Sequence, residues 1–269
     1  MTEGIPAQAT ENAGRFYSMV KSLNDFDKAE IKGVIDTLLS PSPGENCFVG
    51  TYYRTICNID TILECQHAKH VQAVAMLARG LFELSVDMRL LEVIPNAALK
   101  MHEFIDVEKL RCARKIIAFK DTNPNIDLDT TEYVAFVTRN GDRVDRIRQS
   151  LWPNIKRLNH WSGHRMGGRV ALLKAPFDQL YEVDYPRLSW YTHPGLTGIA
   201  NLRPETFTYI CSYAFKLAAD SYSEVLQTLI RKFGLAKTNE KIEHKLHIAM
   251  IFPFANTPEQ VGVLTRSIQ

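Results

Sequence analysis

The chain has 269 residues, of which 45% are apolar and 23% are charged, a balance that excludes a disordered or fibrous protein and predicts a packed core. Its 32 Lys and Arg residues oppose 30 Asp and Glu residues, giving a formal net charge of +2. This value excludes a strong positive field over the whole molecule, so any contact with nucleic acid would have to be local.

The first 14 residues, MTEGIPAQATENAG, are small and polar, so we expect a flexible N-terminal arm over residues 1–14. They lack the basic and then apolar pattern of a secretory signal. No apolar run in the chain approaches the ~20 residues that span a bilayer. The five cysteines form no CxxC pair and no small disulfide framework. These features predict reduced thiols, a cytoplasmic location and no membrane contact.

Apolar residues recur at three- and four-residue steps through the first third of the chain, which is the spacing of amphipathic helices. The first such segment covers residues 15–39, as one helix or as two broken near Asn24, and the sequence SPSPG ends it. The second segment runs from Cys47 to Pro95 and is the longest candidate. A single glycine at position 80 does not forbid one helix from continuing through it.

Five further helical segments follow, over residues 97–120, 132–158, 171–185, 204–233 and 239–251. No strand alternation and no internal repeat is evident, so we predict an all-α, up-and-down helical bundle with additional peripheral helices. The bundle is expected over residues 15–235. Residues 236–269 are expected to form a C-terminal helical extension and tail.

The sequence RGLFE places Arg79 and Glu83 one helical turn apart, on a side of the helix that also carries apolar residues. Such a pair has two interpretations that the sequence does not separate. An ordinary i,i+4 ion pair would contribute ~0.2–0.5 kcal/mol to helix stability. A partly buried pair would instead belong to a functional site.

A second candidate is the sequence YPRLSWYTHPG, which separates Arg187 from His193 by five residues. Arginine is permanently charged and can hold a phosphate through two hydrogen bonds, whereas histidine exchanges a proton near neutral pH. The pair therefore suits metal-independent cleavage of RNA, which needs a base for the ribose 2′-hydroxyl and a cation for the charged phosphorane. The plainer interpretation is a histidine at a helix end that caps backbone carbonyls.

No metal site and no cofactor site is predicted. His160 and His164 of HWSGH lie in a glycine-containing segment without a cysteine or carboxylate at ligand spacing, and HExxH spacing is absent elsewhere. The sequence GHRMGG lacks the GxxxxGK[ST] arrangement of a nucleotide-binding loop. Trp161 could stack on a base, although an aromatic beside a helix end more often anchors a core.

The order of several segments resembles that of a known family. The segments are YYRTICNIDTILE, LARGLFELSVDMRLLE, FIDVEKLRCARKI, HWSGH and LYEVDYPRLSWYTHPG, followed by a long apolar helix that ends in RKFGL. Over roughly residues 45–235, this order is similar to that of the bacterial DUF5677 proteins, a family of uncharacterised function. An RxxxE helix, a tryptophan-containing loop and a Tyr…Ser…His-Pro segment recur in that family.

The DUF5677 family looks related to the HEPN superfamily of helical bundles, which often dimerise and in several branches cleave RNA through an Arg-x4–6-His motif. The resemblance therefore implies a HEPN-like bundle, a homodimer, and an endoribonuclease that acts in a toxin or phage-defence setting. It implies that Arg187 binds the scissile phosphate and that His193 is the general acid and base. Glu83, or Arg79, would orient them.

The resemblance also implies substrate-binding roles for Arg79, Ser189 and Trp161, with RNA or a nucleotide as the partner. Leu188 departs from the family pattern, because active members commonly carry a polar residue after the arginine. This departure and the near-neutral net charge favour the alternative of a noncatalytic HEPN-like module that binds a nucleotide, RNA or a protein. A structural dimerisation protein, in which the arginine and histidine only hold a turn, is a third interpretation.

These motifs are expected to meet in the fold. The helix that carries Arg79 and Glu83 should pack against the segment from Arg187 to His193. Glu83 should then lie within reach of one of those two side chains. A Glu83 that pointed to open solvent far from the segment would contradict this expectation.

Overall fold

The computed structural model describes residues 4–38, 41–65, 70–192 and 204–255. Every regular element in these ranges is helical, which confirms the all-α prediction. None of the described helices is long and apolar enough to cross a bilayer. The chain divides into two compact units, which are residues 1–89 with 170–269 (unit 1) and residues 90–169 (unit 2). The predicted bundle over residues 15–235 thus contains two units.

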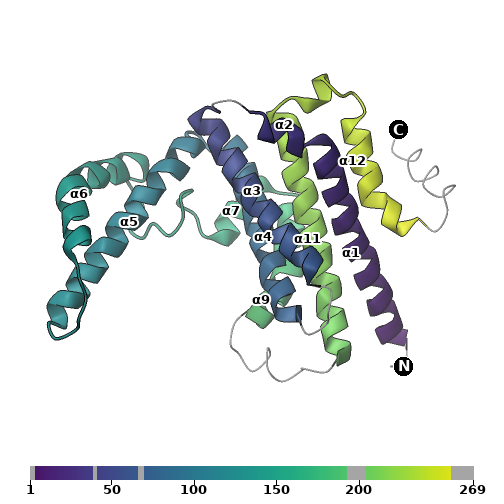
Figure 1. The fold of residues 1–269 in the computed structure, drawn as a ribbon, viewed down its shortest axis with the longest axis horizontal. Helices are drawn as coiled ribbons and strands as arrows, with labels where there is room; N and C mark the ends of the chain where they lie inside the picture. Colours follow the sequence, from purple (N-terminus) through teal and green to yellow (C-terminus); the bar gives the residue numbers. More distant parts are fainter. Residues whose placement is uncertain (1–3, 39–40, 66–69, 193–203, 256–269) are drawn as a thin grey trace. The chain divides into compact units, whose positions relative to one another are not determined.

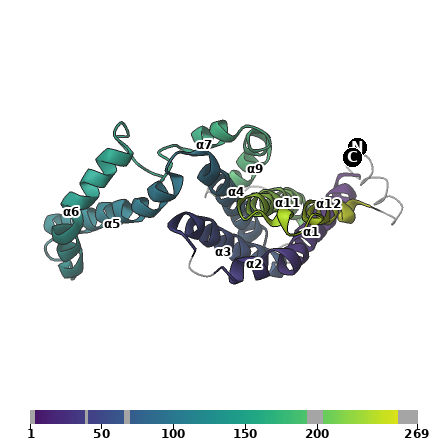
Figure 2. The ribbon, with the colours of Figure 1, turned by 90° about the horizontal axis from the view of Figure 1, so that it is seen from above.

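In unit 1, helix α1 (Gly4–Glu30) packs along helix α11 (Pro204–Lys232), as Figures 1 and 2 show. The ring of Tyr17 meets that of Phe215 edge-on, with 5.4 Å between the centroids. Helix α1 begins at Gly4, so residues 4–14 are helical and not the flexible arm that the sequence predicted. Their small polar side chains give a weak helical signal, and tertiary packing holds the helix, since Ala9 is only 6% exposed.

The long segment from Cys47 to Pro95 forms two helices and not one. A short helix, α2 (Lys32–Asp36), precedes α3 (Pro43–Glu64), and α4 (Val71–Val93) follows. Ser42 starts α3 with a capping box, in which its hydroxyl accepts from the Glu45 amide and its own amide donates to the Glu45 carboxylate. Helix α3 ends at Glu64 because the next residue leaves helical geometry, with ψ 56°.

Helices α3 and α4 approach each other at a glycine. A Cβ on Gly80 would lie 3.3 Å from Nδ2 of the Asn58 side chain, which is tighter than ordinary van der Waals contact. The missing side chain therefore permits close helix packing here. The prediction that Gly80 is compatible with a helical interior is confirmed, since it lies within α4.

A buried carboxyl joins α1 to α3. Asp27 is 1% exposed, and the hydroxyl of Tyr52 donates to its two oxygens at 2.9 and 3.1 Å. Burial raises the pKa of Asp27 to about 6, because the charged form loses its hydration, while the hydrogen bond from Tyr52 opposes that rise. The carboxyl is therefore a pH-dependent element of the unit 1 core.

Unit 2 is built on helix α5 (Ala97–Thr122) and helix α6 (Thr131–Leu151), which lie side by side in Figure 1. Nη1 and Nη2 of Arg114 on α5 donate to the carboxylate of Asp145 on α6, at 3.0 and 2.6 Å. The core beneath consists of Val107, Leu110, Val144, Trp152 and Leu158. The predicted helix over 132–158 ends early, at Leu151, and a Pro follows two residues later.

The chain returns to unit 1 through α7 (Met166–Leu173), α8 (Phe177–Gln179), a five-residue π-helical turn η2 (Leu180–Asp184), and α9 (Tyr185–Thr192). The single helix predicted over 171–185 is therefore wrong. Lys174 adopts φ 62° after α7, in the left-handed conformation that commonly ends helices, and Pro176 cannot continue one. After Pro176, helical geometry continues from Phe177 to Thr192 and so includes Arg187.

The end of the chain also belongs to unit 1. Gly234 ends α11 with φ 63°, as its position after the apolar helix predicted. Helix α12 (Ile242–Ile251) then packs against α1 and α11. The ring of Phe254 meets that of Phe16 at 5.3 Å. The described part of the predicted C-terminal extension is therefore integral to this unit.

Candidate functional site

Tyr185 links the two sequence motifs. Its side chain, at the first position of α9, is 9% exposed and reaches α4. The hydroxyl donates to Oε1 of Glu83 at 2.8 Å and accepts from Nε of Arg79 at 2.9 Å. Arg79 and Glu83 also form an ion pair at 3.3 Å, and the guanidinium carbon of Arg79 lies 4.9 Å from the centroid of the Tyr185 ring. We call these three residues the tyrosine clasp.

The electrostatics of the clasp keep the phenol protonated. Burial, followed by the nearby Glu83 carboxylate, raises the pKa of Tyr185 to about 12. Near neutral pH the hydroxyl is therefore a hydrogen-bond donor to Glu83 and an acceptor for Arg79. This arrangement satisfies both charged groups and fixes the start of α9 on α4.

Helix α4 contacts α9 at Tyr185, two residues before the Arg187–His193 segment, so the expected packing of α4 against that segment itself stays a prediction. The described contacts of Glu83 are with Tyr185 and Arg79, and Arg187 instead lies over the ring of Tyr213 on α11. Of the two side chains that Glu83 was expected to reach, Arg187 is not among its described contacts. His193 lies outside the described residues, so its distance from Glu83 stays a prediction.

Arg187 is half-buried, and its guanidinium carbon lies 4.5 Å from the centroid of the Tyr213 ring. The hydroxyl of Tyr213 pairs with that of Tyr209 at 2.8 Å. Within the described ranges, no carboxylate lies at ion-pairing distance from Arg187. An arginine held by an aromatic face keeps its charge and can use its N–H donors for an anion.

A groove of about 540 Å³ borders these tyrosines, between the beginnings of α1 and α11. Its polar and aromatic lining comprises Gln8, Asn12, Phe16, Tyr209, Ser212, Tyr213 and Lys216. Tyr209 is 44% exposed, so part of its ring is open to a ligand. Aromatic faces beside a cation are the combination that single-stranded nucleic acids use, through stacking and phosphate contacts.

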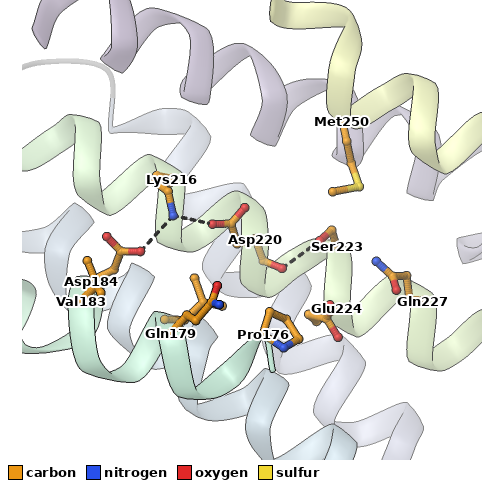
Figure 3. A pocket seen from close by; sticks show the side chains of 11 residues that line it. Pro176, Gln179, Val183, Asp184, Lys216, Asp220, Ser223, Glu224, Gln227 and Met250 are labelled. Atoms are coloured by element: carbon orange, nitrogen blue, oxygen red, sulfur yellow. Dashed lines mark hydrogen bonds and ion pairs between the residues drawn. The ribbon is translucent and has the colours of Figure 1, made fainter. Parts of the chain in front are cut away.

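A lysine anchors the segment that leads into α9. Lys216 on α11 donates to Asp184 and to Asp220, both at 2.9 Å, and Figure 3 shows its nitrogen between the two carboxylates. Asp184 is 4% exposed and directly precedes Tyr185, at the end of the π-helical turn. This turn is thus tied to α11 on one side, while the clasp ties α9 to α4 on the other.

The same anchor borders a cavity of about 420 Å³, whose lining includes Gln179, Glu224 and Met250 (Figure 3). Burial raises the pKa of Asp220, and it also raises that of Glu224. The pKa of Lys216 is raised as well, because its two carboxylate partners outweigh the effect of burial, which favours the neutral amine. The lysine therefore stays charged and acts as an anchor.

Two further residues of α9 have clear positions. Leu188 is 1% exposed and packs in the core, which accounts for an apolar residue directly after Arg187. Ser189 donates its hydroxyl to the carbonyl of Tyr185, one helical turn earlier, at 3.0 Å. A substrate contact of Ser189 stays a prediction.

Trp161 belongs to unit 2 and is 3% exposed. Its carbonyl accepts from the indole of Trp152 at 2.8 Å, and its ring lies 5.3 Å from that of His160. The structure therefore gives Trp161 a packing role and not an open face for a base. Among the described residues, no group of three His, Cys, Asp or Glu side chains is placed to hold a metal ion.

Sequence reasoning missed Tyr185, Tyr213 and the Lys216 anchor. A usable signal existed for the anchor, since Lys216 and Asp220 are charged residues one turn apart on the apolar helix α11. Tyr185 stands in the Tyr…Ser…His-Pro segment, but no signal marks Tyr213 or the partners of either tyrosine, because only the fold brings them together.

Comparison of the chain with protein-family models, curated proteins and solved structures gives no match.

Proposed function

We propose that this chain is a HEPN-like, metal-independent endoribonuclease in which Arg187 binds the scissile phosphate and His193 exchanges protons with the substrate. The proposal rests mainly on the environment of Arg187. This half-buried side chain has its guanidinium over the ring of Tyr213 and has no carboxylate partner among the described residues. A fixed cation with open donors favours an anion. The motif order resembles that of the DUF5677 family, which looks related to the HEPN superfamily with its RNA-cleaving branches, so a phosphodiester is the anion proposed.

In the proposed reaction, His193 takes the proton from a ribose 2′-hydroxyl as that oxygen attacks the phosphorus. The bond between phosphorus and the 5′-oxygen breaks, and Arg187 stabilises the negative charge on the phosphorane oxygens. A protonated imidazole then gives a proton to the departing 5′-oxygen. The products are a 2′,3′-cyclic phosphate and a 5′-hydroxyl, so atoms and charge balance without a cofactor.

The clasp and the lysine anchor act as positioning groups in this proposal. Glu83 and Arg79 hold Tyr185, and Lys216 holds Asp184, so two adjacent residues fix the beginning of α9. Arg187 follows within the same turn of that helix. Its guanidinium can therefore meet a phosphate without a large loss of conformational freedom.

A cleavage assay with labelled single-stranded RNA in EDTA tests the proposal. Arg187→Ala should lower kcat/KM by about 10²–10³-fold, the usual loss when one donor to a developing oxyanion is removed. His193→Ala should abolish cleavage. Arg54→Ala, which removes an exposed arginine from α3, is the matched control and should cleave as the wild type does.

Wild-type rates in the Arg187→Ala and His193→Ala variants would overturn the assignment of the site. Circular dichroism and melting temperature should show that both variants remain folded, so that a loss of cleavage reports on chemistry.

A second candidate function is a noncatalytic module, HEPN-like in form, that binds RNA, a nucleotide or a protein partner. Two observations favour it: Leu188 occupies a buried position beside Arg187, and Glu83 is engaged by the clasp. On this alternative, RNA would bind and remain intact, and Arg187→Ala would weaken binding. Recovery of uncleaved RNA from a stable complex in EDTA would separate the two functions.

A further inference from the structure

Positive charge is concentrated in unit 2. Residues 90–169 contain 14 Lys and Arg against 10 Asp and Glu, whereas the other 189 residues contain 18 against 20. The net charge of +4 in this unit is hidden in the value of +2 for the whole chain. A local basic surface of this kind is what nucleic-acid binding requires of a protein that is near neutral overall.

The charge gathers around a groove of about 680 Å³ between α5, α6 and the segment after α6. Six cationic side chains line it, namely Arg111, Arg114, Lys115, Arg148, Lys156 and Arg157, against a single carboxylate, that of Asp145. The apolar floor includes residues of the unit 2 core, such as Leu110, Val144 and Leu158. We call this surface the basic groove.

Some of these cations serve the fold. Arg114 pairs with Asp145 across the two helices, and Arg111 pairs with Glu108 on its own helix. Nη2 of Arg148 donates to the carbonyls of Ile155 and Lys156, at 3.0 and 3.1 Å. These contacts fasten the segment after α6 and so hold the shape of the groove.

The other three cations are available to a ligand. Lys115, Lys156 and Arg157 are exposed, and none of them pairs with a carboxylate in the part of the chain that the structure describes. They come from α5 and from the fastened segment, so the two sides of the groove both contribute. Three unpaired cations around a preformed groove fit a chain of phosphates more closely than a single small anion.

We propose that the basic groove binds the sugar-phosphate backbone of RNA and that Lys115, Lys156 and Arg157 supply the phosphate contacts. The choice of RNA as the polyanion rests on the proposed function. The inference that this groove binds a polyanion rests only on its cationic side chains. This surface would hold an RNA strand by its backbone, independently of base sequence.

The test is fluorescence anisotropy with the full chain and a labelled, single-stranded 2′-O-methyl RNA of about 20 nucleotides, titrated at 50 to 200 mM KCl. The triple variant Lys115→Ala, Lys156→Ala, Arg157→Ala should bind on the order of a hundredfold more weakly near 100 mM salt, because three counterion-releasing contacts are lost. The slope of log K against log salt should fall in magnitude by about 2, at ~0.7 per phosphate contact.

The matched control removes the same charge from unit 1, by Arg54→Ala, Lys237→Ala and Lys241→Ala, three exposed residues that line neither groove. This control should keep wild-type affinity. A charge-retaining variant, Lys115→Arg, Lys156→Arg, Arg157→Lys, should also bind as the wild type does. Equal weakening of RNA binding in the groove variant and in the unit 1 control would overturn the proposal. Competition by polyglutamate as strong as that by unlabelled RNA would overturn it too.

The 2′-O-methyl probe cannot be cleaved through its 2′-oxygen, so binding is measured whether or not the chain is a ribonuclease. If the proposed ribonuclease function is wrong but the inference holds, RNA will stay intact and the groove variant will still lose affinity. If the function holds but the inference is wrong, Arg187→Ala will lose cleavage while the groove variant binds the probe as tightly as the wild type. The second result would contradict the proposed groove.

Discussion

Tyr185 uses one hydroxyl both to donate to Glu83 and to accept from Arg79, so it completes a pair that is already one helical turn apart. The sequence indicated the pair and left open whether it was more than a surface ion pair. It could not show the third member, because Tyr185 lies more than 100 positions away along the chain. Likewise, Arg187 was identified by its motif, whereas its aromatic partner on α11 is brought to it only by folding.

At this scale the clasp makes a stability prediction. Tyr185→Phe should lower the free energy of unfolding by about 1–2 kcal/mol, because two hydrogen bonds with charged groups are lost while both charged side chains remain partly hydrated. Urea denaturation measures the change. Tyr181→Phe, on the preceding turn, removes a phenol hydroxyl outside the clasp and should change stability by much less. Equal losses in the two variants would contradict the role of the clasp.

Helices were predicted well where apolar spacing decides them, as in α5 and α11. The separation of α3 from α4 was not predicted, because the connecting sequence ECQHAKH contains neither Gly nor Pro. Whether a helix continues through such residues depends on the packing of the flanking helices against the rest of the unit. The same reason explains α1, whose first turns are helical despite small polar side chains.

The buried carboxyl between α1 and α3 predicts a pH dependence. The pKa of Asp27 rises from 3.8 to about 6 on folding, so the native state keeps a proton that the unfolded chain has released between these values. Stability should therefore fall as pH rises through this window, by at most about 3 kcal/mol, and change little from this group above it.

Asp27→Asn mimics the protonated carboxyl and should remove this dependence. Chemical denaturation at pH 4.5 and pH 7.5 measures it, and the stability of the variant relative to the wild type should increase between the two. Asp25→Asn, an exposed neighbour on the same helix, should show no such increase. A relative stability of Asp27→Asn that is the same at both pH values would contradict the assignment.

For the whole molecule, the sequence indicated one bundle over residues 15–235, while the fold contains two units with separate cores. Apolar spacing identifies helices but does not say which of them share a core. The near-neutral total charge likewise concealed the excess of cations in unit 2. The Lys and Arg residues are scattered along the sequence, and they line one basic groove only because α5 and α6 pack side by side.

Separate cores predict separate local stability. Trp152→Ala should cost unit 2 about 3–5 kcal/mol, because the indole is 3% exposed and donates to the carbonyl of Trp161. Hydrogen exchange should then accelerate in α5 and α6 more than in α1 and α11. Leu217→Ala, which truncates a fully buried side chain of α11 in unit 1, should give the reverse pattern. Uniform acceleration in both variants would show a single cooperative core.

The most direct test of the central claim is mass spectrometry of single-stranded RNA incubated with the purified chain in EDTA. We expect fragments that end in a 2′,3′-cyclic phosphate, far fewer of them from Arg187→Ala, and none from His193→Ala or from a fully 2′-O-methylated substrate. RNA that remains intact after prolonged incubation with stoichiometric wild-type protein would contradict the claim that this chain cleaves RNA.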